Sequence, residues 1–270
     1  MCPYTSHIYK LADDLLVGAS ACELLPMLIA TWNLNNRVGK TRFRHDAVGA
    51  VAALQADVAV LSEYYPREHH KVFCTSLGAA GYPYSLASDD HGEIANRILI
   101  VARFPIEHYP IEPPTFDRQF PPNILSVIVP SIGIRLLGIR IPAYGNSGRA
   151  QLHAAWNWLE QTVHAFKDAP AVVLGDLNAN PTSSKAPSGE CFRRILRNGW
   201  HRATPPGGTS YFGLGNRRSE VDHILGNAGC SFANPRYVTG VGEFKLAGAP
   251  DAISDHAALL ADVVVRDLLC

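Results

Sequence analysis

The sequence predicts a mixed α/β (α+β) fold, and three observations support that class. Short apolar runs that end in a polar residue recur along the chain, as buried strands do. Segments with apolar residues at helical spacing lie between these runs. Hydrophobic residues make up 47% of the 270 residues and charged residues 18%, which is typical of a globular chain rather than of a disordered or fibrous one.

The N-terminal part of the chain begins this alternation. Residues 1–26 show no clear hydrophobic period. The runs Met-Leu-Ile-Ala-Thr-Trp-Asn at 27–33 and Asp-Val-Ala-Val-Leu-Ser-Glu at 57–63 are apolar enough to be buried strands. Between them, the apolar spacing predicts a helix over residues 43–54, and a short helix is expected over residues 68–77.

The rest of the chain continues in the same way. Aliphatic and β-branched residues predict strands at 98–102, 124–129 and 132–141. Residues 151–166 predict an amphipathic helix, and residues 171–175 another buried strand. The remaining predicted elements are a helix near 191–197 and strands at 209–212, 221–225, 237–241 and 256–265.

The domain organisation predicted from this pattern is simple. A chain of this length can form one large domain or two small ones. Gly and Pro residues separate the predicted elements, but we find no repeat with a period of 20–50 residues, no low-complexity tract and no convincing linker. We therefore expect one domain over residues 27–267, with residues 1–26 as an appended N-terminal segment.

Charge and cysteine content narrow the function classes. The 24 basic and 24 acidic side chains give a net charge of zero, which argues against tight non-specific binding to nucleic acid or anionic membrane, although local basic patches remain possible. No apolar run reaches the ~18 residues of a membrane span. The six cysteines lack a C-x-x-C pair or a zinc-binding spacing, and the N-terminus is a poor secretory signal. We expect free thiols and a cytoplasmic location.

Polar residues at the ends of predicted strands are the main functional signal. They are Asn33 with Asn35, Glu63, Asp176 with Asn178, Asp222, and Asp255 with His256. Brought together, such side chains would form an oxygen-rich site that suits Mg²⁺ or Mn²⁺ rather than zinc. Each one alone has a plainer explanation. An Asp after a strand is usually a turn residue that bonds its own backbone, and His256 could be a satisfied core histidine.

Five short segments together carry a family resemblance. They read Thr-Trp-Asn at 31–33, Ser-Glu at 62–63, Gly-Asp-Leu-Asn at 175–178, Val-Asp-His-Ile-Leu at 221–225 and Ser-Asp-His at 254–256. In this order, over roughly residues 27–265, the chain resembles the endonuclease/exonuclease/phosphatase superfamily. That group includes apurinic endonucleases, deoxyribonuclease I, sphingomyelinases and inositol-polyphosphate 5-phosphatases. The resemblance implies a four-layer α/β/β/α sandwich with two packed mixed β-sheets.

The resemblance also implies a role for most of these residues. Glu63 would be the principal ligand of a Mg²⁺ or Mn²⁺ ion, with Asn33 and Asp255 beside it. Asp176 would orient or deprotonate the attacking water. The remaining roles concern the phosphate: Asn178 would hold a non-bridging oxygen, and His256, paired with Asp222, would contact the phosphorus side. Whether His256 or Asp176 takes the proton from water is left open.

Two positions depart from the family pattern. Asn35 stands where some relatives have an aspartate, which leaves one charge fewer near the metal. Arg140 stands where relatives usually have a histidine or a tyrosine. Its guanidinium could grip phosphate bidentately, or it could pair structurally with a nearby carboxylate. The residues predicted to contact substrate are Arg140, Asn35, Asn96 and Arg37.

Basic and aromatic residues near these segments are weaker candidates. The basic loop with Arg37, Lys40, Arg42 and Arg44 could border the mouth of the site, as could Arg217 and Arg218, or these could be solvated faces. Tyr211 and Phe212 could stack on bases or pack in the core.

The predicted function is that of a divalent-metal-dependent phosphoesterase. We expect it to cleave a phosphodiester, in a nucleic acid or a nucleotide, by in-line attack of an activated water. One alternative is a phosphatase acting on a small phosphorylated metabolite or lipid headgroup. The other is a binding protein of the same fold that has lost catalysis. The sequence assigns neither the oligomeric state nor the number of metal ions.

Overall fold

The computed structural model describes residues 26–35, 45–65, 68–88, 96–116, 120–144, 148–182 and 187–266. The appended segment predicted over residues 1–26 lies outside the described residues except for Pro26, and residue 267 lies outside them as well. The basic loop with Arg37, Lys40, Arg42 and Arg44 also falls outside them.

The first of two large sheets has six strands in the order β13-β16-β1-β2-β4-β3. Their bounds in that order are Cys230–Val238, Ala258–Val265, Met27–Asn33, Val58–Tyr64, Arg97–Ala102 and Tyr84–Ala87. Strands β1 and β2 are parallel, and the other neighbours are antiparallel. The sheet is therefore mixed.

The second large sheet also has six strands, in the order β5-β6-β7-β8-β12-β9. Their bounds are Glu107–His108, Ile124–Val129, Ile134–Arg140, Ala171–Asp176, Asp222–Gly226 and His201–Arg202. Only β7 and β8 are parallel. Two short hairpins accompany the sheets. One pairs β10 (Tyr211–Phe212) with β11 (Arg218–Ser219), and the other pairs β14 (Gly240–Val241) with β15 (Phe244–Lys245).

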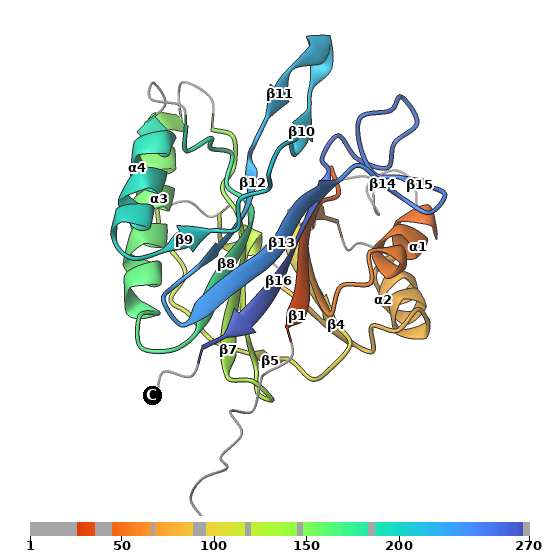
Figure 1. Ribbon diagram of the computed structural model, residues 1–270, viewed down its shortest axis with the longest axis horizontal. Coiled ribbons are helices and arrows are strands. Elements are labelled where there is room, and N and C mark those ends of the chain that lie inside the picture. The colour runs from red at the N-terminus through yellow and green to blue at the C-terminus, as the bar shows by residue number, and fades with distance from the viewer. Residues whose placement is uncertain are drawn as a thin grey trace, which may run out of the picture.

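Helices cover the outer face of each sheet (Figure 1). Helices α1 (His45–Ala53) and α2 (His70–Ala79) pack on the first sheet. Helices α3 (Arg149–Ala165) and α4 (Pro187–Arg197) pack on the second. One apolar cluster lies between the sheets and one lies under each helix pair. The predicted four-layer α/β/β/α sandwich is confirmed.

This layering explains why the strands read as continuous apolar runs. Along β1, Ile29 joins the cluster between the sheets, whereas Ala30 and Trp32 join the cluster under α1 and α2. Both faces of such a strand are buried, so apolar residues need not alternate with polar ones. The sheets also approach closely at Gly138, where a Cβ would lie 2.9 Å from side-chain atoms of Ile98 and Val60.

The predicted elements match the observed ones best where they are long and apolar. The strands predicted at 27–33 and 124–129 have the observed bounds, and the helix predicted over 151–166 spans Arg149–Ala165. The single strand predicted at 237–241 is wrong. The chain there completes β13 and then starts β14, and Pro235 lies within β13 at a register shift. Since β13 is an edge strand, it tolerates a proline that cannot donate to the ladder.

The three cysteines within the described residues, Cys74, Cys191 and Cys230, are free thiols, as predicted. Within the described ranges, no helix is long and apolar enough to cross a membrane.

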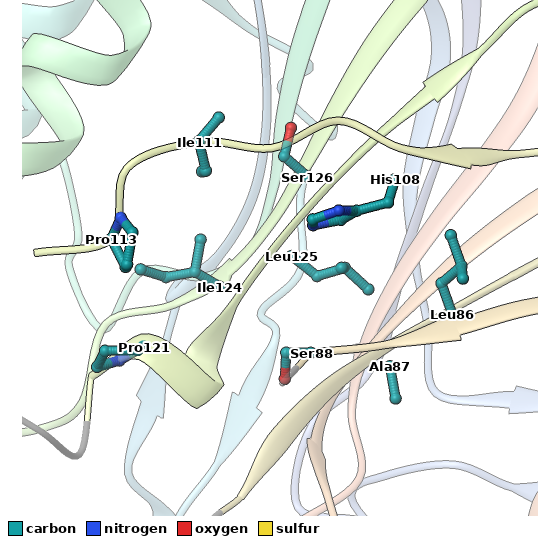
Figure 2. A pocket seen from close by; sticks show the side chains of 10 residues that line it. All are labelled: Leu86, Ala87, Ser88, His108, Ile111, Pro113, Pro121, Ile124, Leu125 and Ser126. Atoms are coloured by element: carbon teal, nitrogen blue, oxygen red, sulfur yellow. The ribbon is translucent and has the colours of Figure 1, made fainter. Parts of the chain in front are cut away.

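A cavity of about 250 Å³ lies where β3 of the first sheet comes near β5 and β6 of the second (Figure 2). Its lining is mixed: it includes aliphatic residues and prolines, and also the polar residues Ser88, His108 and Ser126. None of the polar residues predicted to form the functional site lines this cavity, so the candidate site lies elsewhere.

Candidate active site

The polar strand-end residues meet at one edge of the two sheets. The C-terminal ends of the parallel pairs β1–β2 and β7–β8 lie at this edge, and they carry Asn33, Glu63, Arg140 and Asp176. Strand β12 is antiparallel to β8 and strand β16 to β1, so these two strands bring their N-terminal ends there. Asp222 therefore begins its strand rather than ending it, and lies opposite Asp176 in the ladder.

A cavity of about 350 Å³ opens at this edge. The predicted site residues that line it are Asn35, Glu63, Arg140, Asp176, Asn178, Asp255 and His256. Asn33 and Asp222 are fully buried directly behind the lining, where they bond to Asp176 and His256. The fold thus gathers nine of the ten assigned site residues that lie within the described ranges.

Asp176 is held by three hydrogen bonds in a tight turn. Its Oδ1 accepts the backbone N–H of Asn178 at 2.9 Å, which is the turn geometry expected of an Asp after a strand. Its Oδ2 accepts the amide Nδ2 groups of Asn33 (3.0 Å) and Asn178 (3.1 Å). These bonds therefore hold the carboxylate in one orientation. The same carboxylate also lines the cavity.

The residue before Asp176 has to be glycine. Gly175 has φ +152°, and a Cβ at this position would lie 1.8 Å from the carbonyl oxygen of Ile139 on the parallel strand β7. The Gly-Asp dipeptide of the sequence motif is thus a requirement of backbone packing as well as of chemistry.

The side-chain amides of Asn178 and Asn33, next to Asp176, both form hydrogen bonds within the protein. The Nδ2 of Asn178 donates to Ile141 O (2.8 Å) as well as to Asp176, so neither N–H points at a ligand. Asn33 donates to Asp176 and accepts the backbone N–H of Asn35 through Oδ1 at 2.8 Å. These contacts give both side chains a positioning role. A phosphate contact by Asn178 and a metal contact by Asn33 stay predictions.

A backbone irregularity aims Glu63 into the cavity. The register between β2 and β4 shifts between Leu61 and Tyr64, and Glu63 within this bulge has φ +51°. Left-handed φ values are uncommon for residues other than Gly, Asn and Asp, and bulges often redirect a side chain near functional sites. The sequence motif Ser-Glu indicates the residue but not this local twist.

His256 is paired with a buried carboxylate. Its Nδ1 lies 2.7 Å from Oδ2 of Asp222, and both side chains are almost completely buried. The backbone around His256 is anchored by Trp32 Nε1, which donates to His256 O (2.8 Å), and by Ser254 Oγ, which accepts the His256 N–H (3.0 Å). The aromatic ring of Tyr211 packs against the imidazole, with ring centroids 5.1 Å apart.

The environment separates the protonation behaviour of Asp176 from that of His256. Burial and the charge of Asp222 raise the pKa of Asp176 to about 6, although His256, Arg140 and the Asn178 N–H act in the opposite direction. Burial alone would lower the pKa of His256, but the carboxylates of Asp222, Asp176 and Asp255 outweigh it and raise that pKa to about 9. At neutral pH the imidazole is therefore charged, and both of its nitrogens are donors.

Arg140 pairs with Glu63. Its Nη2 lies 2.8 Å from Oε1 of Glu63, and the two side chains are 16% and 11% exposed. The sequence left a choice between a phosphate contact and a structural ion pair for Arg140, and the ion pair is formed here. Because Arg140 also lines the cavity, the predicted phosphate contact stays a prediction.

The donor set fits a hard divalent cation. Carboxylate or imidazole atoms of Asp176, Asp222 and His256 lie within 4.8 Å of one another. Oδ1 of Asp222 and Oδ1 of Asp255 are buried without a hydrogen-bond partner among the described residues, and Oδ1 of Asp255 has only the longer ion pair to Nε2 of His256, at 3.8 Å. Orphaned carboxylate oxygens are costly unless a cation or a donor meets them. A charged His256 cannot itself coordinate a metal, which leaves the carboxylates as the donors.

Among the predicted substrate residues that the structure describes, one is not brought to the cavity. Asn96 immediately precedes β4 and does not line it. Arg37 lies outside the described residues. Conversely, Tyr211, Ser219 and Val221 do line the cavity. The sequence offered Tyr211 only as a weak candidate, and it gave Val221 no role of its own although this residue opens the motif at 221–225. No local signal marks Ser219, which the hairpin β10–β11 brings to the cavity.

The four-layer fold and this acidic, histidine-bearing cavity are those of a divalent-metal-dependent phosphoesterase. A family model described as the Endonuclease/Exonuclease/phosphatase family matches residues 30–256. The chain belongs to this family, which consists of hydrolases that act on phosphate esters. The sequence-based prediction of the family and of the enzyme class is confirmed.

Solved structures agree on the fold. The chain is similar to the 3′ phosphatase NExo from Neisseria, with 17% identity and a TM-score of 0.64 over 87% of this chain and 98% of that one. It is also similar to truncated TDP2 from Caenorhabditis elegans, with 14% identity and a TM-score of 0.63 over 89% of this chain and 98% of that one. An AP endonuclease from Archaeoglobus fulgidus has 18% identity to the chain and a TM-score of 0.62, over 90% of this chain and 100% of that one. At these identities the likeness concerns the fold alone. No curated protein matches the chain.

Proposed function

We propose that this protein is a Mg²⁺- or Mn²⁺-dependent phosphodiesterase that hydrolyses nucleic acid or a nucleotide-type ester by in-line attack of an activated water. The observation that carries the proposal is the meeting of Asp176, Glu63 and the Asp222-paired His256 at one cavity. Such a set supplies a proton acceptor, a cation ligand and a charged hydrogen-bond donor, which are the groups that phosphate-ester hydrolysis requires.

Asp176 is the better proton acceptor of the two candidates. A group acts best as a general base when its pKa lies just below the working pH, and burial and Asp222 raise the pKa of Asp176 to about 6. His256 is charged at neutral pH and has no free lone pair. We therefore assign water activation to Asp176, and donation of an Nε2–H hydrogen bond to a phosphate oxygen to His256.

The cation site in this proposal consists of Glu63 and Asp255, with Asn33 beside them. A bound divalent ion would neutralise charge on the phosphate and stabilise the charge that develops in the transition state. The four carboxyl groups of Glu63, Asp176, Asp222 and Asp255 outnumber the two cations, Arg140 and His256, among the described residues at the site. This excess of negative charge favours a divalent cation and disfavours a phosphate ester without one.

The hairpin β10–β11 supports a polymeric substrate. It projects from the body of the protein (Figure 1), and Tyr211 at its base lines the cavity. At its tip Leu214 is 93% exposed, and the Arg218 guanidinium stacks on the ring of Phe212 with 4.5 Å to the centroid. An arm with an exposed apolar tip and arginines can contact bases and backbone phosphates beyond the scissile bond. The solved 3′ phosphatase NExo, of the same fold, is described with a bound product DNA hairpin.

A phosphatase acting on a small phosphorylated molecule is the second candidate. A cavity of about 350 Å³ is large enough for one phosphorylated metabolite or headgroup, and such a substrate would not need the hairpin. The same active-site residues would serve, so only the preferred substrate separates the two functions.

Hydrolysis of a chromogenic phosphodiester, beside the corresponding monoester, tests this proposal. The assay is run with Mg²⁺, with Mn²⁺ and with a chelator, on the wild type, Asp176→Asn and, as a matched control, the exposed Asp168→Asn. We expect metal-dependent turnover that favours the diester and falls by about 10²- to 10⁴-fold in Asp176→Asn only. Preference for the monoester would select the phosphatase. No turnover by the wild type on either ester or on an oligonucleotide, despite metal binding, would favour the retired binding protein.

A further inference from the structure

The pairing of Arg140 with Glu63 links the two sheets inside the cavity. Arg140 is the last residue of β7 in the second sheet, and Glu63 lies in the bulge near the end of β2 in the first. Nη2 of Arg140 lies 2.8 Å from Oε1 of Glu63, and both side chains are mostly buried. The Arg140 guanidinium is therefore bound to an oxygen of Glu63, the carboxylate that serves as a cation ligand in the proposed function.

This ion pair does not satisfy the whole guanidinium. The Nε of Arg140 is buried and has no hydrogen-bond partner among the described residues. A buried donor without a partner is unfavourable compared with one that is paired. An arginine whose only purpose was to stabilise the fold would be expected to use its planar set of donors more fully. A phosphate oxygen in the cavity, which Arg140 lines, would supply the missing acceptor.

The charge of Arg140 also reaches the catalytic carboxyl group. Arg140 lies opposite Asp176 in the parallel ladder between β7 and β8. Its positive charge is one of the influences that hold the pKa of Asp176 down against burial. Arg140 therefore stands between two acidic groups, one on each sheet, and partly replaces the positive charge that a metal ion would supply there.

We propose that Arg140 is a built-in counter-ion that competes with the divalent cation for Glu63, and that it transfers to the phosphate of the substrate when the cation binds. The inference rests on the proposed function, because it takes Glu63 as a cation ligand. It goes beyond the proposed function because it gives Arg140 two roles. Arg140 sets the metal affinity of the site, and it couples metal binding to substrate binding. Wild-type protein without substrate should hold its metal weakly, and phosphate should tighten metal binding.

The competition has a definite sign. Replacing Arg140 by a neutral residue removes one unit charge a few ångströms from the divalent ion. This should tighten metal binding by about tenfold even at the dielectric constant of water, and by more in a partly buried site. If Arg140 instead holds Glu63 in position for the metal, the same replacement weakens metal binding. The direction of the change therefore separates a competitor from a structural support.

Titration with Mn²⁺, followed by electron paramagnetic resonance of the free ion, measures this without any need for turnover. The proteins are the wild type, Arg140→Gln, Arg140→Met, Arg140→Lys and Glu63→Gln. Arg135→Met is the matched control, since Arg135 lies near the opposite end of β7 and stacks on the ring of Tyr109. Two neutral replacements are included so that one poorly folded variant does not decide the result. Each titration is repeated with inorganic phosphate.

We expect Arg140→Gln and Arg140→Met to bind Mn²⁺ at least about tenfold more tightly than the wild type. Arg140→Lys and Arg135→Met should stay within about threefold of it. Phosphate should tighten Mn²⁺ binding most in the wild type, since coupling between two ligands is reciprocal. Unchanged or weaker binding in both neutral variants, or equally tight binding in Arg140→Lys, would overturn the proposal while leaving the metal site intact. Absence of Mn²⁺ binding in the wild type and in every variant would overturn the proposed function with it.

Discussion

Replacement of Asp222 by Asn should convert His256 from a charged to a neutral side chain at physiological pH. Asp222 Oδ2 lies 2.7 Å from Nδ1 of His256, and Asp222 is the largest of the influences that raise the pKa of His256. Burial lowers the pKa of His256, so that pKa should fall once the charge of Asp222 no longer offsets the effect of burial. An amide has the same shape as the carboxylate, which keeps the packing of the site.

The size of the effect follows from the pKa of His256. Its value of about 9 lies about 2.5 pH units above the ordinary value of 6.5, which corresponds to about 3 kcal/mol in favour of the charged form. Without Asp222 we expect a value near or below 6.5, so that at pH 8 the charged fraction falls from about nine tenths to a few per cent. Loss of a charged donor to the phosphate should lower turnover by about 10²-fold or more.

The assay is the pH dependence of kcat, together with a titration of the His256 ring by NMR. In the wild type, activity should persist up to about pH 9 and then fall as His256 loses its proton. In Asp222→Asn this alkaline limb should move down by about 2.5 pH units or more. Asp262→Asn is the control, because the Asp262 carboxylate accepts a hydrogen bond from the exposed side chain of Asn234 and does not line the cavity. An alkaline limb that stays in place in Asp222→Asn would refute the assignment of His256 as a charged donor.

Two further predictions concern the hairpin and the core. Leu214→Ser at the exposed hairpin tip should lower kcat/KM for an oligonucleotide several-fold more than for a chromogenic small ester, since only a polymer reaches the tip; equal effects on both substrates would contradict a polymer-binding role. His223 is buried, donates through Nε2 to Ala179 O (2.8 Å), and burial lowers its pKa to about 4. The imidazole of His223 takes up a proton below about pH 6.5 in the unfolded chain but only below about pH 4 in the folded protein. The free energy of unfolding should therefore fall by about 3 kcal/mol as the pH is lowered from about 6.5 to about 4, and below about pH 4 His223 should cause no further loss. In His223→Gln, denaturant titrations should show a flatter decline over this range, and a decline as steep as in the wild type would count against it.

The parts of the fold that the sequence predicted correctly are those with a strong local pattern. Strand β1 and helix α3 are long, and their apolar residues follow a strand or a helix period closely. The strands β3, β5 and β9, which have two to four residues, carry no such period and were not predicted. Their pairing with longer strands, rather than any preference of their own residues, makes them strands.

The candidate site divides in the same way. Short motifs identified Glu63, Asp176, Asp222 and His256, because residues that carry chemistry directly follow or precede buried strands. The role of Tyr211 was not decided by any motif, since a hairpin formed by residues 211–219 carries it to the imidazole. Asn96 was expected at the site because the strand that it opens resembles a site-lining strand of the family, but Asn96 does not line the cavity.

The sequence by itself determined the apolar periods, the polar residues at strand ends and the family, because each of these is local or depends only on the order of motifs. The tertiary structure alone decided which oxygens meet and what charge they carry. Arg140 meets Glu63, 77 positions away, only because two sheets pack face to face. His256 is charged because carboxylates, above all that of Asp222 on a strand of the other sheet, are buried against it. Coulomb interactions depend on the distance between two charges in the folded protein and on how deeply they are buried. Neither quantity can be read from the separation of the residues along the chain.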